Sequence, residues 1–137
     1  MAEGKILLEI VTPQGLVFSE EVDEVAAAGS EGEFGVLPGH VPFVTTLKIG
    51  VLTCKKGSEA RYFFVNWGYA EVGAEKVMIL ADSAERSEDI DIDRAMAAKK
   101  RAEERLKRID DVDFARAEAA LDSAIMRTQI VEARRGK

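Results

Sequence analysis

A short segment near residue 90 carries charged residues at spacings that suit the binding of an anion. Residues 90–95 are Ile90-Asp91-Ile92-Asp93-Arg94-Ala95, with Glu85 before them and Arg101 after them. Because Arg94 and Arg101 are seven residues apart, they share one face of a helix, and guanidinium groups match phosphate oxygens well. A nucleotide site, a docking surface for an acidic partner and an ordinary solvated basic face all remain open. The spacing alone favours the solvated face.

The rest of the sequence offers little for catalysis. His40 and Cys54 are the single histidine and the single cysteine, and the chain has no Cys-x-x-Cys, P-loop or Gly-x-Ser-x-Gly motif. A lone histidine cannot build a multi-histidine metal centre. Cys54 lies in an alternating apolar run that favours a buried residue, and His40 lies between two prolines, as at a turn or an interface. We therefore expect no catalytic residue and no metal site.

The charge of the chain is unevenly distributed. The net charge of −6 argues against nucleic acid as the main partner. Residues 1–85 hold 6 Lys or Arg against 13 Asp or Glu, whereas residues 86–137 hold 13 against 12. No apolar run is long enough to cross a bilayer and the N-terminus lacks a signal-peptide pattern, so a cytosolic location is expected.

Glycine and proline divide the chain into two parts. Ten of the eleven glycines and all three prolines precede residue 74, and these residue types mark turns. Short runs rich in β-branched and aromatic residues fill residues 1–85, which predicts an antiparallel β-sandwich or flattened barrel. Residues 29–42 contain four glycines and two prolines, and we expect them to form a loop.

Residues 86–137 are typical of an antiparallel pair of helices. Asp91 is suited to cap a first helix over about residues 92–109, and Asp111 or Asp113 a second. Apolar stripes at spacings of three and four consist of Ala95, Ala98, Ala102, Leu106 and Ile109, and of Phe114, Ala117, Leu121, Ala124, Thr128 and Val131. Since alanine buries little apolar area but forms helices well, the helices would hold together weakly. A static hairpin and a moving one remain open, and periodicity alone favours the static one.

Two stretches of the chain are similar to a known family. Residues 29–43, GSEGEFGVLPGHVPF, followed by Leu47-Lys48-Ile49-Gly50, resemble the signature of the epsilon subunits of F-type ATP synthases. Residues 91–95 and 111–115 resemble the helical hairpin of that family. The resemblance covers the whole chain in order. It implies an α+β protein, with a β-sandwich of about ten antiparallel strands over residues 1–85 and a helical hairpin over residues 86–137.

The resemblance also implies a function and partners. The protein would be a non-catalytic subunit of the central stalk, bound to the gamma subunit and the c ring at the cytoplasmic face of the inner (plasma) membrane, and peripheral through the complex. Glu31, Glu33 and His40 would face the c ring and gamma. The hairpin would extend to block ATP hydrolysis by docking on the catalytic beta and alpha subunits. The basic residues for that docking would be Lys99, Lys100, Arg105 and Arg108.

Some members of that family bind ATP through an Ile/Leu-Asp-x-x-Arg-Ala motif. The resemblance implies a regulatory ATP site formed by Glu85, Ile90, Asp91, Arg94, Ala95 and Arg101. It implies no cofactor that is required for function. The second helix departs from the pattern, because Ala124 and Thr128 stand where binding members have arginines, and Arg116 and Arg127 are only nearby. We therefore expect weak binding, in the millimolar range, or about −4 kcal/mol.

A second hypothesis belongs to another class of protein. The chain would be a free-standing small-ligand or adaptor module that uses the loop of the sandwich as its pocket. Co-purification with a coiled-coil partner similar to gamma separates this hypothesis from the first.

Overall fold

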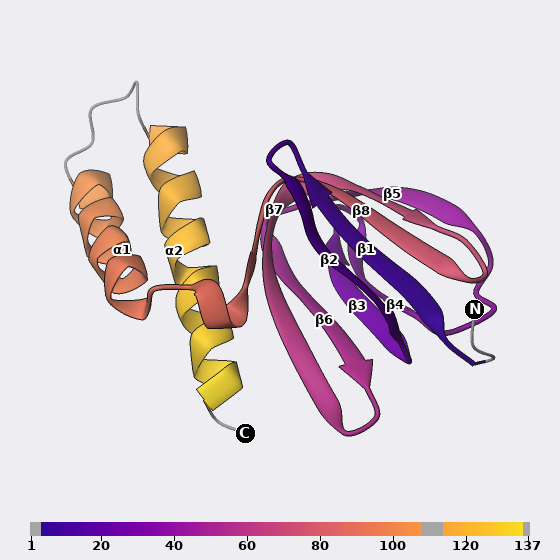
Figure 1. Ribbon diagram of the computed structural model, residues 1–137. Coiled ribbons are helices and arrows are strands. Elements are labelled where there is room, and N and C mark those ends of the chain that lie inside the picture. The colour runs from indigo at the N-terminus through magenta and orange to yellow at the C-terminus, as the bar shows by residue number, and fades with distance from the viewer. Residues whose placement is uncertain (1–3, 108–113, 136–137) are drawn as a thin grey trace.

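A computed structural model of the protein describes residues 4–107 and 114–135. Eight strands come first, and two helices follow them (Figure 1). The strands are β1 Ile6–Thr12, β2 Gly15–Val22, β3 Glu24–Gly29, β4 Gly32–Val36, β5 Phe43–Leu47, β6 Gly50–Lys56, β7 Glu59–Val72 and β8 Lys76–Arg86. The short 3₁₀ helix η1 Ser87–Asp89 then leads into α1 Ile92–Lys107 and α2 Phe114–Arg135.

The strands form a sheet that folds over on itself, which confirms the predicted sandwich followed by two helices. The strand order is β2-β1-β8-β7-β5-β3-β4, and β6 pairs with both β3 and β7. Two details of the expectation were wrong. Strands β1 and β8 pair in parallel, so the sheet is not wholly antiparallel. The described residues form eight strands rather than about ten, and β7 runs through residues 59–72 as a single strand.

A bend in β7 lets this one strand serve both layers. Its first half pairs with β6 and its second half with β5. The bend lies at Trp67, with φ of 49°, and Gly68, with φ of 156°. A Cβ atom on Gly68 would lie 2.0 Å from the carbonyl oxygen of Leu80, so the crossing of β7 and β8 requires glycine at this position.

The core lies between the layers and is built by alternation along the strands. Ile6, Leu8 and Ile10 of β1 are fully buried, and each such side chain contributes about 1.5–3 kcal/mol when removed from water. Cys54 joins this core, and its burial raises the pKa of the thiol to about 11. The prediction of a buried rather than a reactive cysteine is therefore confirmed.

The prediction that residues 29–42 form a loop is wrong in part. Strand β4 occupies its first half and pairs with β3, so that Gly29 stands opposite Gly32 across a tight turn. Residues 30–31, in the turn between β3 and β4, and residues 37–42 lie outside the strands. Gly39 has φ of 82° and donates its N–H to the carbonyl oxygen of Ala74 at 2.8 Å, which ties this loop to the β7–β8 turn. Glycine-rich sequence here marks turns and a strand between them, not one continuous loop.

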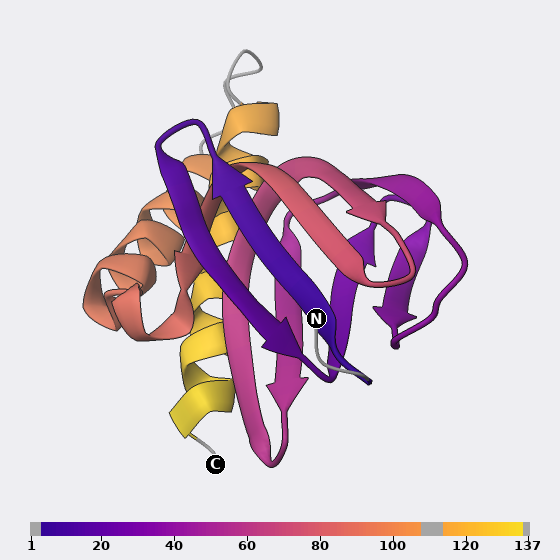
Figure 2. The ribbon, with the colours of Figure 1, turned by 45° about the vertical axis from the view of Figure 1, so that its right-hand side comes forward.

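The helices pack on the outer face of the sheet as an antiparallel pair. Helix α2 lies between α1 and strands β6 and β7 (Figures 1 and 2). Asp91 caps α1 as predicted, because its Oδ1 accepts the N–H of Arg94 at 3.1 Å. The buried part of the seam between the helices consists of Ala95 and Ala102 on α1 and of Ala117, Ala124 and Thr128 on α2. The expected caps Asp111 and Asp113, and Ile109 of the expected stripe, lie outside the described residues.

A second, smaller apolar cluster holds α2 on the sheet. Its fully buried members are Phe64 of β7 and Ile130 and Val131 of α2, with Ile90 between η1 and α1. Partly buried side chains pack around them, namely Ile49, Val51, Tyr62, Ile92 and Met126. We call this set the helix-docking cluster. Because Phe63 and Phe64 point to opposite faces of β7, one strand serves both the sandwich core and the helix-docking cluster.

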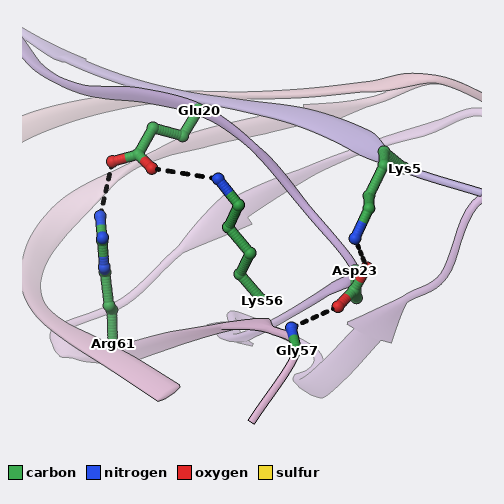
Figure 3. A network of polar contacts seen from close by, with 6 residues as sticks. All are labelled: Lys5, Glu20, Asp23, Lys56, Gly57 and Arg61. Atoms are coloured by element: carbon green, nitrogen blue, oxygen red, sulfur yellow. Dashed lines mark hydrogen bonds and ion pairs between the residues drawn. The ribbon is translucent and has the colours of Figure 1, made fainter. Parts of the chain in front are cut away.

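A network of ion pairs and hydrogen bonds lies near the turn between β6 and β7 (Figure 3). Lys5 pairs with Asp23, and the other carboxylate oxygen of Asp23 accepts the N–H of Gly57 at 2.6 Å. Beside it, Glu20 accepts a hydrogen bond from Arg61 at 2.5 Å and lies 3.8 Å from the amino group of Lys56. These contacts tie β1 and β2 to the β6–β7 hairpin.

The Asp23 contacts predict a dependence of stability on pH. The hydrogen bond from Lys5, followed by that from the Gly57 N–H, holds the pKa of Asp23 below its ordinary value of 3.8. A lowered pKa stabilises the folded state above pH 3.8, and this contribution is lost as the pH falls through the folded-state pKa. Asp23→Asn should therefore flatten the acid side of a urea-unfolding profile, whereas Asp82→Asn, at an exposed position, should not. Parallel acid profiles for Asp23→Asn and the unmodified chain would refute this.

Candidate functional site

The residues predicted to form a nucleotide site line one pocket. The pocket has a volume of about 330 Å³ and lies where β8, η1, α1 and α2 meet. Its lining includes all six predicted residues, which are Glu85, Ile90, Asp91, Arg94, Ala95 and Arg101. Asp89, Ala98 and Arg127 complete it. A pocket of this size falls at the lower end of the range for small-molecule sites.

Local structure explains how these side chains come together. Glu85 lies near the end of β8, and the turn through η1 brings the chain back so that α1 starts beside it. Asp91 is used as the cap of α1, so the first turn of the helix is fixed at the pocket wall. Arg94 and Arg101 are exposed on α1 and line the pocket two turns apart, as their spacing predicted.

Arg127 joins the pocket from the second helix. Its Nε donates to a carboxylate oxygen of Glu85 at 2.5 Å, and its guanidinium carbon lies 4.3 Å from the centre of the Phe64 ring. The neighbouring positions Ala124 and Thr128 are buried in the seam, where the Thr128 hydroxyl bonds to the carbonyl oxygen of Ala124 at 2.9 Å. The sequence placed Arg127 only near the site. The one signal in the sequence was that Arg127 is adjacent to Thr128, which belongs to the predicted apolar stripe of the second helix.

The predicted partner residues lie in two other places. Glu31 and Glu33 are exposed at and next to the tight turn between β3 and β4. Half-buried His40 lies on the following loop, with its Nδ1 2.7 Å from the carbonyl oxygen of Val41 and its ring against Phe43. Glu33 also lines a shallow hollow of about 360 Å³ with Phe34, Thr53 and neighbouring small residues.

The basic residues assigned to docking lie on α1, the helix farther from the sheet. Lys100 and Arg105 are exposed and Lys99 is half-buried. Within the described ranges, none of these three forms an ion pair. Arg108, the fourth predicted residue, lies outside the described residues.

An exposed apolar stripe was missed by the sequence analysis. It crosses the outer face of four adjacent strands, where cross-strand pairing joins Leu16 to Val11, Val11 to Leu80, and Leu80 to Tyr69. Trp67 lies two residues before Tyr69 and is 50% exposed, and Leu16 is 62% exposed. We call Leu16, Val11, Leu80, Tyr69 and Trp67 the outer stripe. A contiguous exposed apolar surface marks an interaction site, but only the strand pairing shows that these residues are contiguous.

Family models and similar proteins of known identity point to the same family. Residues 5–87 match the family described as ATP synthase, Delta/Epsilon chain, beta-sandwich domain, and residues 88–132 match its long alpha-helix domain. The chain is 56% identical over 129 residues to the ATP synthase epsilon chain of Nitratidesulfovibrio vulgaris, covering 93% of this chain and 96% of the relative. It is 52% identical over 132 residues to that of Geotalea uraniireducens, covering 95% of each.

Solved structures agree. A chain of the Euglena gracilis mitochondrial ATP synthase, in a structure of OSCP, F1 and the c ring, superimposes with a TM-score of 0.81 at 25% identity. That match covers 98% of this chain and 83% of the other. A chain of the Tetrahymena thermophila central stalk and c ring shares the fold, with a TM-score of 0.60. Among the described helices, none is long and apolar enough to span a membrane. The chain belongs to the delta/epsilon family of ATP synthases, as an epsilon chain, which is a non-catalytic subunit of the stalk.

Proposed function

We propose that this epsilon chain attaches to the rotor through its sandwich and regulates ATP hydrolysis through its hairpin. The observation that carries the proposal is the docking of α2. The sandwich has its own core, whereas the hairpin is held to it by the smaller helix-docking cluster and by the Glu85–Arg127 ion pair. A rigid body with a separately held pair of helices suits a rotor subunit with a moving arm.

The outer stripe is the surface proposed to bind the gamma subunit. It is apolar and partly solvent-exposed, and burial of such side chains contributes about 25 cal/mol per Å². The β3–β4 turn with Glu31 and Glu33, and the loop with His40, are proposed to face the c ring. Acidic side chains there complement polar or basic loops on a partner. This arrangement would hold the protein peripherally at the cytoplasmic face of the inner (plasma) membrane.

The inhibitory state is proposed to be an extended form of the hairpin. Leaving the sheet would expose the helix-docking cluster, so the extended helices must gain equivalent contacts elsewhere in the complex. The exposed basic face with Lys100 and Arg105, together with Lys99, suits an acidic surface on the catalytic beta or alpha subunits. Alanine in the seam supports this exchange, because alanine-rich helices persist without a partner and lose little area on separation.

The pocket between β8, α1 and α2 is proposed to bind ATP as a regulatory ligand. Because residues of β8, η1, α1 and α2 together form its wall, a bound ligand would stabilise only the docked form. Ligand binding shifts such an equilibrium by RT ln(1 + [L]/Kd), which is about 0.8 kcal/mol, or fourfold, at three times Kd. Weak binding is therefore sufficient for regulation when the cellular ATP concentration is comparable to Kd.

Titration of the isolated protein with MgATP tests this site. Amide signals of Arg94, Ala95 and Arg101 should shift with a dissociation constant of about 1 mM, while those of β1 and β2 should not. Arg94→Gln should weaken the response by about tenfold, since a hydrogen bond to a charged group is lost. If no signal moves at Arg94 or Ala95 at high ATP concentration, the chain has no such site.

A further inference from the structure

Trp67 lies at the bend of β7 in a backbone conformation that suits glycine better than tryptophan. Its φ is 49°, and among the residues that the structure describes it is the one non-glycine residue with a positive φ. The left-handed conformation is unfavourable for a residue with a Cβ atom, and glycine tolerates it best. The close approach of Gly68 to the carbonyl oxygen of Leu80 fixes the path of the strand here. The chain therefore places its largest type of side chain where the fold favours the smallest.

The indole of Trp67 belongs to neither apolar cluster. The residue is 50% exposed, and it is absent from the sandwich core, from the helix-docking cluster and from the partly buried side chains packed against them. The indole therefore contributes little to folding, while its backbone conformation is unfavourable. Tryptophan is among the residue types most enriched in binding hot spots. A strained and half-exposed tryptophan is thus better explained by binding than by packing.

An acidic residue stands beside Trp67 on the neighbouring strand. The ladder between β7 and β8 pairs Gly68 with Ala81, so the preceding residue Trp67 lies across from Asp82. Asp82 is exposed, and it has no hydrogen bond or ion pair within residues 4–107 and 114–135. An aromatic ring beside an unpaired carboxylate favours a cationic group, because a guanidinium or an ammonium interacts well with both.

We propose that Trp67 anchors the outer stripe on the gamma subunit, and that Trp67 and Asp82 together bind a basic side chain of that partner. This inference rests on the proposed attachment of the sandwich through the outer stripe. Tyr69 and Leu80 would surround the anchor and exclude water from it, as the neighbours of a hot spot do. The partner surface is therefore apolar, with an arginine or lysine next to the apolar area. The acidic balance of residues 1–85 favours such a partner.

The test is to titrate the full chain and its variants with the isolated gamma subunit by calorimetry. Trp67→Ala should weaken binding by about thirtyfold, which is the loss expected for a hot spot. Asp82→Asn keeps the shape of the side chain but removes its charge, and it should weaken binding by about tenfold. Met96→Ala is the matched control, because Met96 is apolar and 56% exposed but lies on α1, and it should change the affinity by less than about twofold.

Glycine and alanine at residue 67 together test the strain. Both substitutions remove the indole, so both should weaken binding to gamma equally. The Trp67→Gly chain should nevertheless be more stable than the Trp67→Ala chain, by about fivefold in the folding equilibrium constant, because alanine keeps a Cβ atom at a positive φ. Urea unfolding measures this difference. If the alanine chain is as stable as the glycine chain, Trp67 is not strained, and the argument that it is placed there for binding is wrong.

A fluorine label makes the test independent of the variants. Trp67 is the only tryptophan of the chain, so incorporation of 5-fluorotryptophan gives one ¹⁹F signal, and an unlabelled gamma subunit adds none. This signal should shift when gamma is added, and it should lose its sensitivity to the exchange of H₂O for D₂O as the indole leaves water. An unchanged signal at saturating gamma would refute the anchor.

Leu80→Asp distinguishes failure of this inference from failure of the proposed attachment. Leu80 is 45% exposed in the middle of the outer stripe, and a charge there should abolish binding to gamma if the stripe is the interface. If Leu80→Asp abolishes binding but Trp67→Ala does not weaken it, the anchor is refuted and the attachment stands. If Asp82→Asn alone binds as the unmodified chain does, the basic side chain is refuted. If Leu80→Asp binds normally, or the unmodified chain does not bind gamma, both the attachment and the anchor are refuted.

Discussion

Phe64→Ala is expected to release α2 from the sheet while leaving the sandwich folded. Phe64 is fully buried in the helix-docking cluster, and its ring also supports Arg127 at 4.3 Å. Truncating a buried phenylalanine costs about 3–5 kcal/mol, and here that loss falls on the docked hairpin rather than on the sandwich core. Hydrogen exchange should show α2 amides exchanging faster by roughly two to four orders of magnitude, with β1 and β8 unchanged.

The neighbouring residue supplies the control for this experiment. Phe63 is equally large and 1% exposed, but it points into the sandwich core, where its ring meets Phe18 at 4.9 Å between centroids. Phe63→Ala should therefore lower the stability of the sandwich strands themselves. If the two variants have the same exchange pattern, the hairpin and sandwich unfold as one unit, and the separate docking of α2 is wrong.

Removal of the hairpin in the assembled complex is expected to raise ATP hydrolysis. A chain ending before Asp89 keeps all eight strands. The last strand residue, Arg86, remains anchored because its guanidinium donates to the carbonyl oxygen of Val17 at 2.7 and 3.2 Å. The complex should assemble, and hydrolysis should rise on the order of tenfold, which corresponds to about 1.4 kcal/mol of inhibitory docking.

A charge variant distinguishes the contribution of the basic side chains to inhibition from the contribution of the whole hairpin. Lys99→Gln, Lys100→Gln and Arg105→Gln together keep the helices but remove the charges proposed to dock on the catalytic subunits. This variant should give part of the increase seen with the truncation. Hydrolysis that stays at the level of the intact complex after truncation would show that the hairpin does not inhibit.

The parts of the fold that depend on local sequence could be predicted. Alternation in β1 and the stripes of α1 and α2 follow from periodicity, and the cap at Asp91 follows from residue type. The bend at Trp67 and Gly68 could not, because its cause is the close approach of Leu80 from another strand. The parallel pairing of β1 with β8 is likewise a property of the folded sheet and leaves no mark on either strand.

Some residues of the candidate site could likewise be predicted from the sequence, and others could not. Glu85, Arg94 and Arg101 lie close in the sequence, so a turn and two helical turns are enough to bring them to one pocket. Arg127 enters from α2, and its place depends on how the two helices align along their seam. The outer stripe depends on the register of four strands, since alternation marks one face as exposed but does not show which exposed residues are neighbours.

The most direct test of the account is the distance between the sandwich and α2, measured by spin labels at the exposed positions Glu59 and Gln129. Cys54 need not be replaced, because it is buried and its pKa is raised to about 11, so it stays unreactive toward the labelling reagent. The account predicts one short distance in the isolated chain with MgATP, and a second, longer one in the nucleotide-free complex. A single unchanged distance under all of these conditions, or no short distance in the isolated chain, would contradict it.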